Sequence, residues 1–383
     1  MNQPVSLDPQ EKRLFVDNLQ RFLKDEVAPH YDDWEKAGIW PRALWRRFGE
    51  QGFLCVDVPE AYGGYGVSFE LSCLVVDEVS KFGFGALASG LSVHSDIVAP
   101  YILNLGSEAQ KEKYLPGMVS GEIVGAIGMT EPSAGSDLQR IKTHAARDGD
   151  QFKINGQKTF ITNGQHCDLI VLATKTDPNQ GAKGMTLFTV DCASNGFNRG
   201  RNLDKMGLHS GDTSELFFDD LIVTTADILG GEGQGFVNMM KELPRERLIL
   251  GVGCVGAAQG AFDLTVAYIT ERQAFGQAVA GFQNSRYKLA EMKTDIELCR
   301  AMAEKYTAQF IAGELTSAEA SMLKLAASEM QGRVADQCVQ MFGGYGYMTE
   351  YPISRAYLDA RIQRIYGGTS EIMKELISRS IVS

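Results

Sequence analysis

The sequence predicts an α+β protein built from three successive regions: helices, then short strands, then long helices. The spacing of hydrophobic residues changes from a helical to a strand-like period near residue 123 and back again near residue 237. The length of 383 residues corresponds to roughly 2.6 domains of about 150 residues, which favours two or three compact units. A hydrophobic content of 44% with 22% charged residues excludes a largely disordered chain.

The first region, residues 1–122, is expected to be an all-α domain. Asp8–Glu11 supplies an N-cap, a first-turn proline and the acid of a capping box. Hydrophobic residues over 15–27 then recur at helical spacing. After a glycine-rich loop at Pro59–Gly66, the stretch Leu71–Leu105 is again helical and rich in small residues.

The second region, residues 123–236, has the signals of short strands. Asn155-Gly156 is typical of a two-residue hairpin turn. Runs rich in β-branched and aromatic residues follow at Leu169–Ala173, Met185–Val190 and Glu215–Phe218, separated by turn residues. This spacing indicates a β-barrel or a sandwich and not a series of βαβ units.

The third region, residues 237–383, predicts a helical bundle. Hydrophobic residues from Leu289 to Phe310 alternate at spacings of three and four, as in a heptad seam. Thr316–Glu319 is a capping box, and a similar seam continues over Ala320–Met341. Long helices with short connections form antiparallel bundles.

Charge and cysteine content narrow the class of protein. The 48 acidic and 37 basic residues give a net charge of −11, which disfavours broad nucleic-acid binding. The seven cysteines are widely spaced without a CxxC motif, as in free thiols of a reducing compartment. The five histidines are scattered, so no metal site is expected.

The chain carries no visible targeting or membrane signal. The start MNQPVSLDPQEK lacks the basic and apolar segments of a signal peptide. The longest uncharged stretch, Leu248–Phe262, is shorter than the roughly 18 residues that a membrane span needs. We therefore expect no membrane span and a bacterial cytoplasmic location, or the mitochondrial matrix if this is a processed eukaryotic chain.

Several glycine-rich segments are candidates for nucleotide binding. Gly343–Gly346 resembles part of a dinucleotide fingerprint, but a long helix precedes it, which favours a helix C-cap. Met129–Asp137 gathers hydroxyl groups and backbone N–H donors that suit a heterocycle edge or a phosphate, although an ordinary loop would look similar. Arg272 and Tyr366–Glu371 are further candidates, with a solvated arginine as the alternative at Arg272.

Taken together and in order, six segments resemble the acyl-CoA dehydrogenase family, and within it the long-chain and isovaleryl branches. They span nearly the whole chain, and they are Tyr62–Gly64, Met129–Asp137, Lys158–Asn163, Glu271–Gly276, Gln340–Gly344 and Tyr366–Glu371. The resemblance implies a helical domain over 1–122, a β-barrel over 123–236 and a four-helix bundle over 237–383. It also implies FAD as cofactor and a coenzyme A thioester as substrate.

The resemblance also implies which residues contact the FAD. Around the flavin ring these are Ile127, Met129, Thr130, Gly135, Ser136, Phe160, Ile161 and Thr162. Toward the pyrophosphate and adenine they are Arg272, Phe275 and Gln283. Gln340, Met341, Phe342, Gly343 and Gly344 would reach the FAD of a neighbouring subunit, and Thr369, Ser370 and Glu371 would contact the phosphates.

The catalytic base is the point at which the chain departs from most of the family. The usual carboxylate follows the tyrosine of the Tyr-x-Gly-Thr-Ser motif, and here that position is Gly367. The long-chain and isovaleryl branches instead carry a glutamate before an arginine on the first bundle helix, which implies Glu246 as base and Arg247 as a tuning residue. Burial beside an acyl chain would raise the pKa of Glu246. The alternatives are Glu371 as base and a solvated, ion-paired Glu246.

The implied reaction is α,β-dehydrogenation of a long-chain or branched acyl-CoA to a trans-2-enoyl-CoA, with α-proton removal by Glu246 and β-hydride transfer to flavin N5. The backbone N–H of Gly367 would donate to the thioester oxygen. Expected substrate contacts are Ser136, Ala182, Lys183, Pro244, Arg245, Arg247, Gly367 and Gly368. Small residues over Gly85–Ser92 could leave room for the acyl tail or serve only close helix packing.

The resemblance also implies binding partners, and other functions on the same fold remain as alternatives. We expect a homotetramer and an electron-transferring flavoprotein as electron acceptor. A flavin-dependent monooxygenase or nitroalkane oxidase on the same fold is the main alternative, and a non-enzymatic scaffold that retains FAD is another.

Overall fold

The computed structural model describes residues 6–382. The first five residues of the N-terminal segment, where we expect no signal peptide, lie outside the described residues. The first region is helical, as predicted, and its capping box at Asp8 is confirmed: Asp8 Oδ1 accepts from Gln10 N and Glu11 N, and Asp8 N donates to Glu11 Oε2 over 2.8 Å. The elements are α1 (Pro9–Phe22), π-turn η1 (Leu23–Val27), α2 (Ala28–Ala37), α3 (Ala43–Glu50), α4 (Phe69–Lys81), α5 (Gly85–Ser92), π-turn η3 (Val93–Val98), α6 (Ala99–Leu105) and α7 (Glu108–Ser120).

The middle region is a β domain, which confirms the predicted change of period. Its strands are β1 (Gly125–Gly128), β2 (His144–Asp148), β3 (Gln151–Thr162), β4 (Leu169–Lys175), β5 (Met185–Asp191), β6 (Phe197–Asn202), β7 (Thr213–Thr224) and β8 (Ile228–Leu229). The order is β6-β7-β3-β2-β4-β5-β8, with β1 parallel to β4. Among the described residues no pairing joins β6 to β8, so the expected barrel is an open sheet by strand pairing.

The predicted hairpin at Asn155-Gly156 is wrong. β3 runs through both residues without turning, and the turn lies instead between β2 and β3 at Gly149. Asn155 and Gly156 lie at a register shift against β7. There the Asn155 side chain exchanges hydrogen bonds with Asp220, and a Cβ on Gly156 would lie 2.5 Å from Thr143 Oγ1. The glycine serves a close backbone approach at a bulge, which leaves the same dipeptide signature as a turn.

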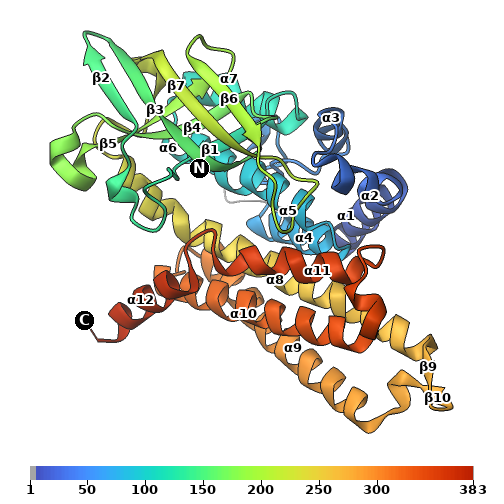
Figure 1. The fold of residues 1–383 in the computed structure, drawn as a ribbon. Helices are drawn as coiled ribbons and strands as arrows, with labels where there is room; N and C mark the ends of the chain where they lie inside the picture. Colours follow the sequence, from blue (N-terminus) through green and yellow to red (C-terminus); the bar gives the residue numbers. More distant parts are fainter. Residues whose placement is uncertain (1–5, 383) are drawn as a thin grey trace.

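The third region contains α8 (Gly235–Glu271), α9 (Gln283–Ile311), α10 (Ser317–Phe342), α11 (Pro352–Ala360) and α12 (Ser370–Ile381), with a small hairpin of β9 (Gln273–Ala274) and β10 (Gln277–Ala278). The heptad seam is confirmed, since Met292, Ile296, Cys299, Ala303 and Tyr306 are buried on α9. The capping box at Thr316 is also present. Figure 1 shows the long helices lying together beneath the β domain, with α4 and α5 between the two layers.

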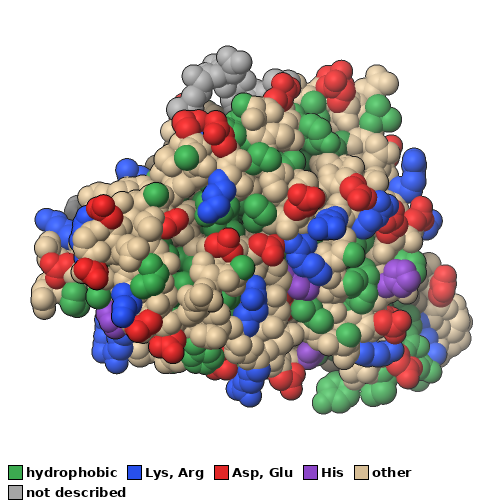
Figure 2. Space-filling model, turned by 90° about the horizontal axis from the view of Figure 1, so that it is seen from above, with side chains coloured by type: hydrophobic (Ala, Val, Ile, Leu, Met, Phe, Trp, Pro, Cys, Tyr) green, Lys and Arg blue, Asp and Glu red, His purple; other side chains and the backbone are tan. Residues whose placement is uncertain are grey.

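Two helical segments are long and apolar enough to span a membrane by composition alone. They are Gly85–Leu105 and Gly235–Glu271, and 78% and 56% of their apolar windows are buried within the fold. Packing of the first segment on β1 and of α8 on α4 and α10 accounts for this composition. On the face seen in Figure 2, acidic and basic side chains are interspersed and form no basic stripe.

Candidate active site

A central cavity of about 480 Å³ opens between the β domain and the helical bundle. It gathers every residue predicted to surround the flavin ring: Ile127, Met129, Thr130, Gly135, Ser136, Phe160, Ile161 and Thr162. From the helical side come Leu243, Glu246, Arg247 and Leu250 of α8 and Tyr366, Gly367 and Gly368 before α12. Segments more than 200 residues apart in the chain therefore form one site.

Phe160 presents an exposed aromatic ring at this site. It lies within β3 at a second register shift, has a φ of 58° and is 67% exposed. A positive φ is strained for a bulky residue, and such strain concentrates at functional sites. A neighbouring cavity of about 680 Å³ shares Phe160, Thr162 and Tyr366 with the central one. An accessible ring between two cavities, beside the hydroxyls of Thr130 and Ser136, fits a planar heterocycle such as a flavin.

Glu246 is held in the cavity wall by a tyrosine that sequence reasoning did not identify. Glu246 is only 6% exposed, and Tyr101 of α6 donates its hydroxyl to Glu246 Oε1 over 3.0 Å. Burial raises the pKa of Glu246 to about 7, against the hydrogen bond from Tyr101 and the charge of Arg247, while Glu242 raises it further. A carboxylate with this pKa accepts and releases a proton near neutral pH.

The local helix geometry explains which α8 residues face the cavity. Leu243, Glu246, Arg247 and Leu250 are spaced i, i+3, i+4 and i+7 and share one helix face. Arg247 Nη1 donates to Ser317 Oγ over 3.3 Å, and its buried Nε has no acceptor among residues 6–382. The predicted tuning residue therefore lies beside the predicted base.

Arg245, which was predicted to contact the substrate, does not line the central cavity. Its Nη2 donates to Asp57 Oδ2 over 2.7 Å, its Nε donates to the Asp96 carbonyl over 2.9 Å, and the guanidinium lies over the Phe69 ring. This buried pairing joins α8 to the N-terminal domain. Pro244 also does not line the central cavity.

Gly367 has a specific steric requirement. Its φ is 63°, and a Cβ there would lie 2.3 Å from Leu250 Cδ1. Leu250 thus occupies the space into which a side chain at position 367 would extend. Gly368 has a φ of 99°, and a Cβ there would lie 2.6 Å from Met373 Cε. Neither glycine N–H donates a hydrogen bond within residues 6–382, so both remain available beside the cavity.

Two side chains of α10 hold the glycine turn in place. Lys324 Nζ donates to the Gly368 carbonyl over 2.6 Å, and Ser370 Oγ donates to Glu329 Oε1 over 2.8 Å. Thr369 caps α12 by accepting from Ile372 N. The Thr369 and Ser370 side chains are therefore engaged within the protein. Glu371, the alternative base, is exposed and does not line the central cavity.

The remaining predicted residues fall into two outlying groups. Ala182 and Lys183 lie in a turn near the start of α8, where the Lys183 carbonyl closely approaches Gly233, and they do not line the cavity. Arg272 shares a separate cavity of about 560 Å³ with Gln340–Gly344 and lies over the Tyr345 ring. Phe275 is 97% exposed nearby, and Gln283 is exposed at the start of α9.

Distance separates this second group from the flavin-ring residues. Arg272 follows Glu246 by 26 residues at the end of α8, which is about 39 Å at 1.5 Å per residue. Arg272 and Phe275 therefore lie too far from the central cavity to contact an FAD that is bound there in the same chain. Any shared contact requires a second copy of the chain.

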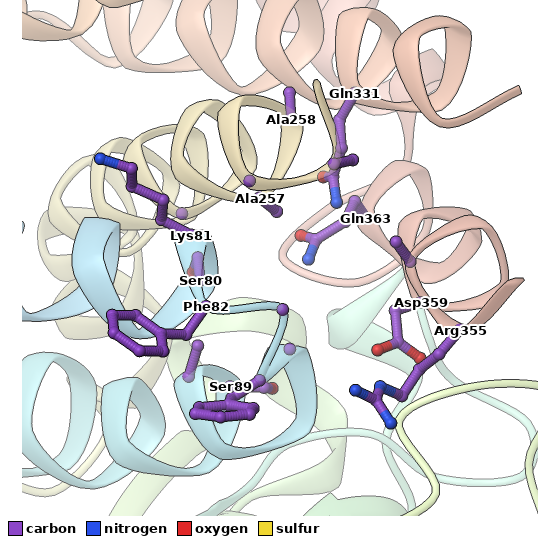
Figure 3. A pocket seen from close by; sticks show the side chains of 18 of the residues that line it. Ser80, Lys81, Phe82, Ser89, Ala257, Ala258, Gln331, Arg355, Asp359 and Gln363 are labelled. Atoms are coloured by element: carbon purple, nitrogen blue, oxygen red, sulfur yellow. The ribbon is translucent and has the colours of Figure 1, made fainter. Parts of the chain in front are cut away.

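Figure 3 shows a lateral cavity of about 490 Å³ lined by Ser89 and Ala257. This cavity adjoins the central one, and the two share Ser89, Ser92, Leu250 and Tyr366. It continues along α8 past Gly253, Ala257, Ala261 and Leu264. The small residues of α5 line this cavity in part and pack closely in part. Gly85, Ala88 and Ser89 line the lateral cavity, whereas a Cβ on Gly90 would lie 2.6 Å from Trp40.

Among residues 6–382 no group of three or more histidine, cysteine or carboxylate side chains is arranged to hold a metal ion. All seven cysteines are buried and free of disulfide bonds. The Sγ atoms of Cys167 and Cys192 lie 3.5 Å apart, beyond bonding distance.

Comparison with known proteins identifies the family. The chain matches the N-terminal, middle and C-terminal domains described as "Acyl-CoA dehydrogenase" over residues 9–122, 126–221 and 233–382. It is 45% identical over 375 residues to the long-chain specific acyl-CoA dehydrogenase, mitochondrial, of Rattus norvegicus, which covers 97% of this chain and 87% of that protein. It is 35% identical over 369 residues to the isovaleryl-CoA dehydrogenase, mitochondrial, of Arabidopsis thaliana, with 96% and 90% covered.

A solved structure agrees with these matches. The crystal structure of acyl-CoA dehydrogenase from Geobacillus kaustophilus superposes with a TM-score of 0.94 at 46% identity and covers 98% of both chains. The matches include all three predicted regions in the predicted order. The chain therefore belongs to the FAD-dependent acyl-CoA dehydrogenase family and is an acyl-CoA dehydrogenase, a flavin oxidoreductase.

Proposed function

We propose that the protein oxidises long-chain acyl-CoA thioesters to trans-2-enoyl-CoA and that Glu246 removes the α-proton. FAD, when bound against the residues around Phe160, supplies the acceptor for the β-hydride. The observation that carries the proposal is the position of one buried carboxylate in the wall of the central cavity. Asp137 and Glu375 also line this cavity, but both are exposed, whereas Glu246 is buried and hydrogen-bonded.

Glu246 takes the proton in its carboxylate form and returns it to solvent after the reaction. Its pKa of about 7 balances these two requirements, because a much lower pKa weakens the base and a much higher one keeps it protonated. The hydrogen bond from Tyr101 fixes the carboxylate rotamer. Burial in the wall excludes water that would otherwise solvate the charge.

The N–H groups of Gly367 and Gly368 polarise the thioester carbonyl. They line the cavity without an acceptor among residues 6–382, and two donors aimed at one oxygen stabilise the charge that develops during α-proton removal. Lys324 and Glu329 fix the turn that presents them. The proposed role needs only backbone atoms, which is consistent with a glycine at position 367.

The preference for long chains rests on the length of the lateral cavity. From Glu246 to Ala257 the α8 axis advances about 16 Å, and to Leu264 about 27 Å. At about 1.3 Å per carbon of an extended alkyl chain, these lengths hold about 12 and 20 carbons beyond the α-carbon. Leu264 is 37% exposed, so the far end is not closed by a buried wall.

The experiment is anaerobic reduction of the bound flavin by saturated acyl-CoA thioesters from four to eighteen carbons. We expect bleaching with the highest kcat/KM between twelve and eighteen carbons. A clear preference for the butyryl thioester would contradict the long-chain assignment. Bleaching by no acyl-CoA would contradict the dehydrogenation and favour the monooxygenase or oxidase alternative.

We further propose that a second copy of the chain completes the FAD site and that the protein is a homotetramer. The exposed Phe275, with Arg272 and Gln340–Gly344, lies too far from the central cavity to reach the same cofactor. Phe275→Asp is expected to weaken both FAD retention and assembly, as measured by flavin absorbance and sedimentation. A variant that keeps both would contradict this role.

The CoA moiety and the electron acceptor follow from the family resemblance. We propose that Ser136 at the cavity, together with Ala182 and Lys183 nearby, contacts the CoA thioester. We also propose an electron-transferring flavoprotein as the acceptor. Reoxidation of the acyl-CoA-reduced enzyme by such a flavoprotein, faster than by oxygen, is the expected result, and faster reoxidation by oxygen would contradict it.

A further inference from the structure

The lateral cavity has an apolar wall and a polar wall. The mainly apolar wall comes from α4, α5 and α8; it includes Val76, Ala88, Gly253 and Ala257, and the hydroxyls of Ser80, Ser89 and Ser92 also line it. The opposite wall carries Gln331 of α10, Arg355 and Asp359 of α11, and Gln363 of the 3-10 turn η9 (Arg361–Arg364). Figure 3 shows these four side chains on the side of the cavity opposite Ser80 and Phe82. A cavity for a plain alkyl tail needs no such wall.

Two of the four polar side chains have structural partners. Asp359 Oδ1 accepts from Leu208 N over 2.6 Å, and Arg355 Nη1 donates to Asp32 Oδ1 over 2.8 Å. These contacts tie α11 to the β domain and to α2. They account for the presence of both charged groups without a ligand.

The two glutamines, Gln331 and Gln363, have fewer structural partners than Asp359 and Arg355. Gln331 is 4% exposed, and its buried Oε1 has no hydrogen-bond partner within residues 6–382. Gln363 is half-buried: its Oε1 accepts from the thiol of Cys254 over 3.4 Å, a weak donor, and its amide nitrogen is within reach of the Tyr366 hydroxyl. A buried amide oxygen without a partner, as at Gln331, is costly, and a hydroxyl on a ligand would satisfy it.

The depth of this pair sets where such a group would lie. Gln363 contacts Cys254, which follows Glu246 by eight residues, or about 12 Å along α8. At about 1.3 Å per carbon this corresponds to about nine carbons beyond the α-carbon, which is near C11 or C12 of the acyl chain.

We propose that Gln331 and Gln363 form a subsite for a hydroxyl or keto substituent near the eleventh or twelfth carbon of the acyl chain, so that the enzyme selects mid-chain oxygenated acyl-CoA over the plain chain. This inference rests on the proposed dehydrogenation at the central cavity. The chain passes along the apolar wall of α8, and the amide groups bind the substituent from the opposite side.

The test compares three CoA thioesters of equal length: octadecanoyl, 12-hydroxyoctadecanoyl and 18-hydroxyoctadecanoyl. Anaerobic flavin reduction gives kcat/KM for each. The 12-hydroxy substrate is expected to exceed both others by at least tenfold, mainly through a lower KM. Gln331→Leu and Gln363→Leu, made separately, are expected to remove this preference while octadecanoyl turnover is retained. Gln337→Leu, on the same helix but outside the cavity, is the matched control and is expected to keep it.

The outcomes separate the two proposals. The subsite would be overturned if the wild type turned over octadecanoyl-CoA as well as or better than the 12-hydroxy substrate and neither glutamine variant changed the ratio of the two kcat/KM values. Bleaching by none of the three thioesters would instead contradict the proposed dehydrogenation. Since the two variants lie on different elements, misfolding of one leaves the other as a test.

Discussion

Replacing Tyr101 by phenylalanine tests how the base is tuned. The variant removes one hydroxyl, and with it the 3.0 Å hydrogen bond to Glu246, while the buried ring is retained. A hydrogen bond to a charged group contributes about 1.5–3 kcal/mol. One pKa unit corresponds to about 1.36 kcal/mol, so the loss raises the pKa of Glu246 from about 7 by roughly one to two units.

The direction of the pKa change follows from the form of Glu246 that the hydrogen bond stabilises. Tyr101 donates to the carboxylate, so its loss favours the protonated form, which cannot accept the α-proton. The ionised fraction at pH 7 falls from about one half to between about one tenth and one hundredth, a decrease in rate of roughly 5- to 50-fold. At pH above the new pKa the rates of the variant and the wild type converge.

The assay is the rate of anaerobic flavin bleaching by a long-chain acyl-CoA between pH 5.5 and 10. The expected result is an acidic limb displaced upward by one to two pH units in Tyr101→Phe. The matched control is Tyr62→Phe, which removes a similar tyrosine-to-glutamate hydrogen bond of 2.7 Å to Glu108 at the surface. An acidic limb that does not move in Tyr101→Phe would refute the tuning role.

Three further predictions concern the base and the acyl tail. The double variant Gly367→Glu, Glu246→Gly is expected to remain nearly inactive because Leu250 fills the space at position 367. Adding Leu250→Ala to this double variant is expected to raise turnover at least tenfold. Equal rates for the double and the triple variant would contradict the steric argument. Burial raises the pKa of Glu246 from 4.5 to about 7, so ionisation of Glu246 destabilises the folded protein as pH rises through this window. Glu246→Gln should therefore raise Tm at pH 8 by an amount equivalent to about 3 kcal/mol and change it little at pH 4.5. Equal Tm differences at both pH values would refute this. Ala257→Phe should block the lateral cavity and lower kcat/KM for hexadecanoyl-CoA at least tenfold relative to octanoyl-CoA, whereas an unchanged chain-length profile would contradict the tail path.

Local sequence signals predicted the helices well. The capping boxes at Asp8 and Thr316 form as expected because each is complete within four residues. The Asn155-Gly156 signal failed because a bulge and a turn require the same small, permissive residue. Only the pairing with β7, about 65 residues later, distinguishes the two.

The site was predictable where a motif is continuous. The residues predicted to contact the flavin ring within 127–136 and 160–162 surround one cavity, as expected from the resemblance. Arg245 does not share the cavity face of Glu246, because adjacent helix residues point about 100° apart and the cavity-lining residues follow the i, i+3, i+4 spacing from Leu243. Tyr101 carried no local signal, since its contact with Glu246 joins positions 145 residues apart.

The most direct test of the central claim is single-turnover flavin bleaching by a long-chain acyl-CoA in Glu246→Gln, with Glu242→Gln as control. Glu242 lies one turn earlier on α8, is also largely buried and accepts from Asn104, so the control removes a similar carboxylate that does not line the cavity. General base catalysis contributes about 10²- to 10⁴-fold, so we expect a loss of this size in Glu246→Gln with flavin still bound, and a change of only a few-fold in Glu242→Gln. A Glu246→Gln enzyme that bleaches at near the wild-type rate would contradict the assignment of the base.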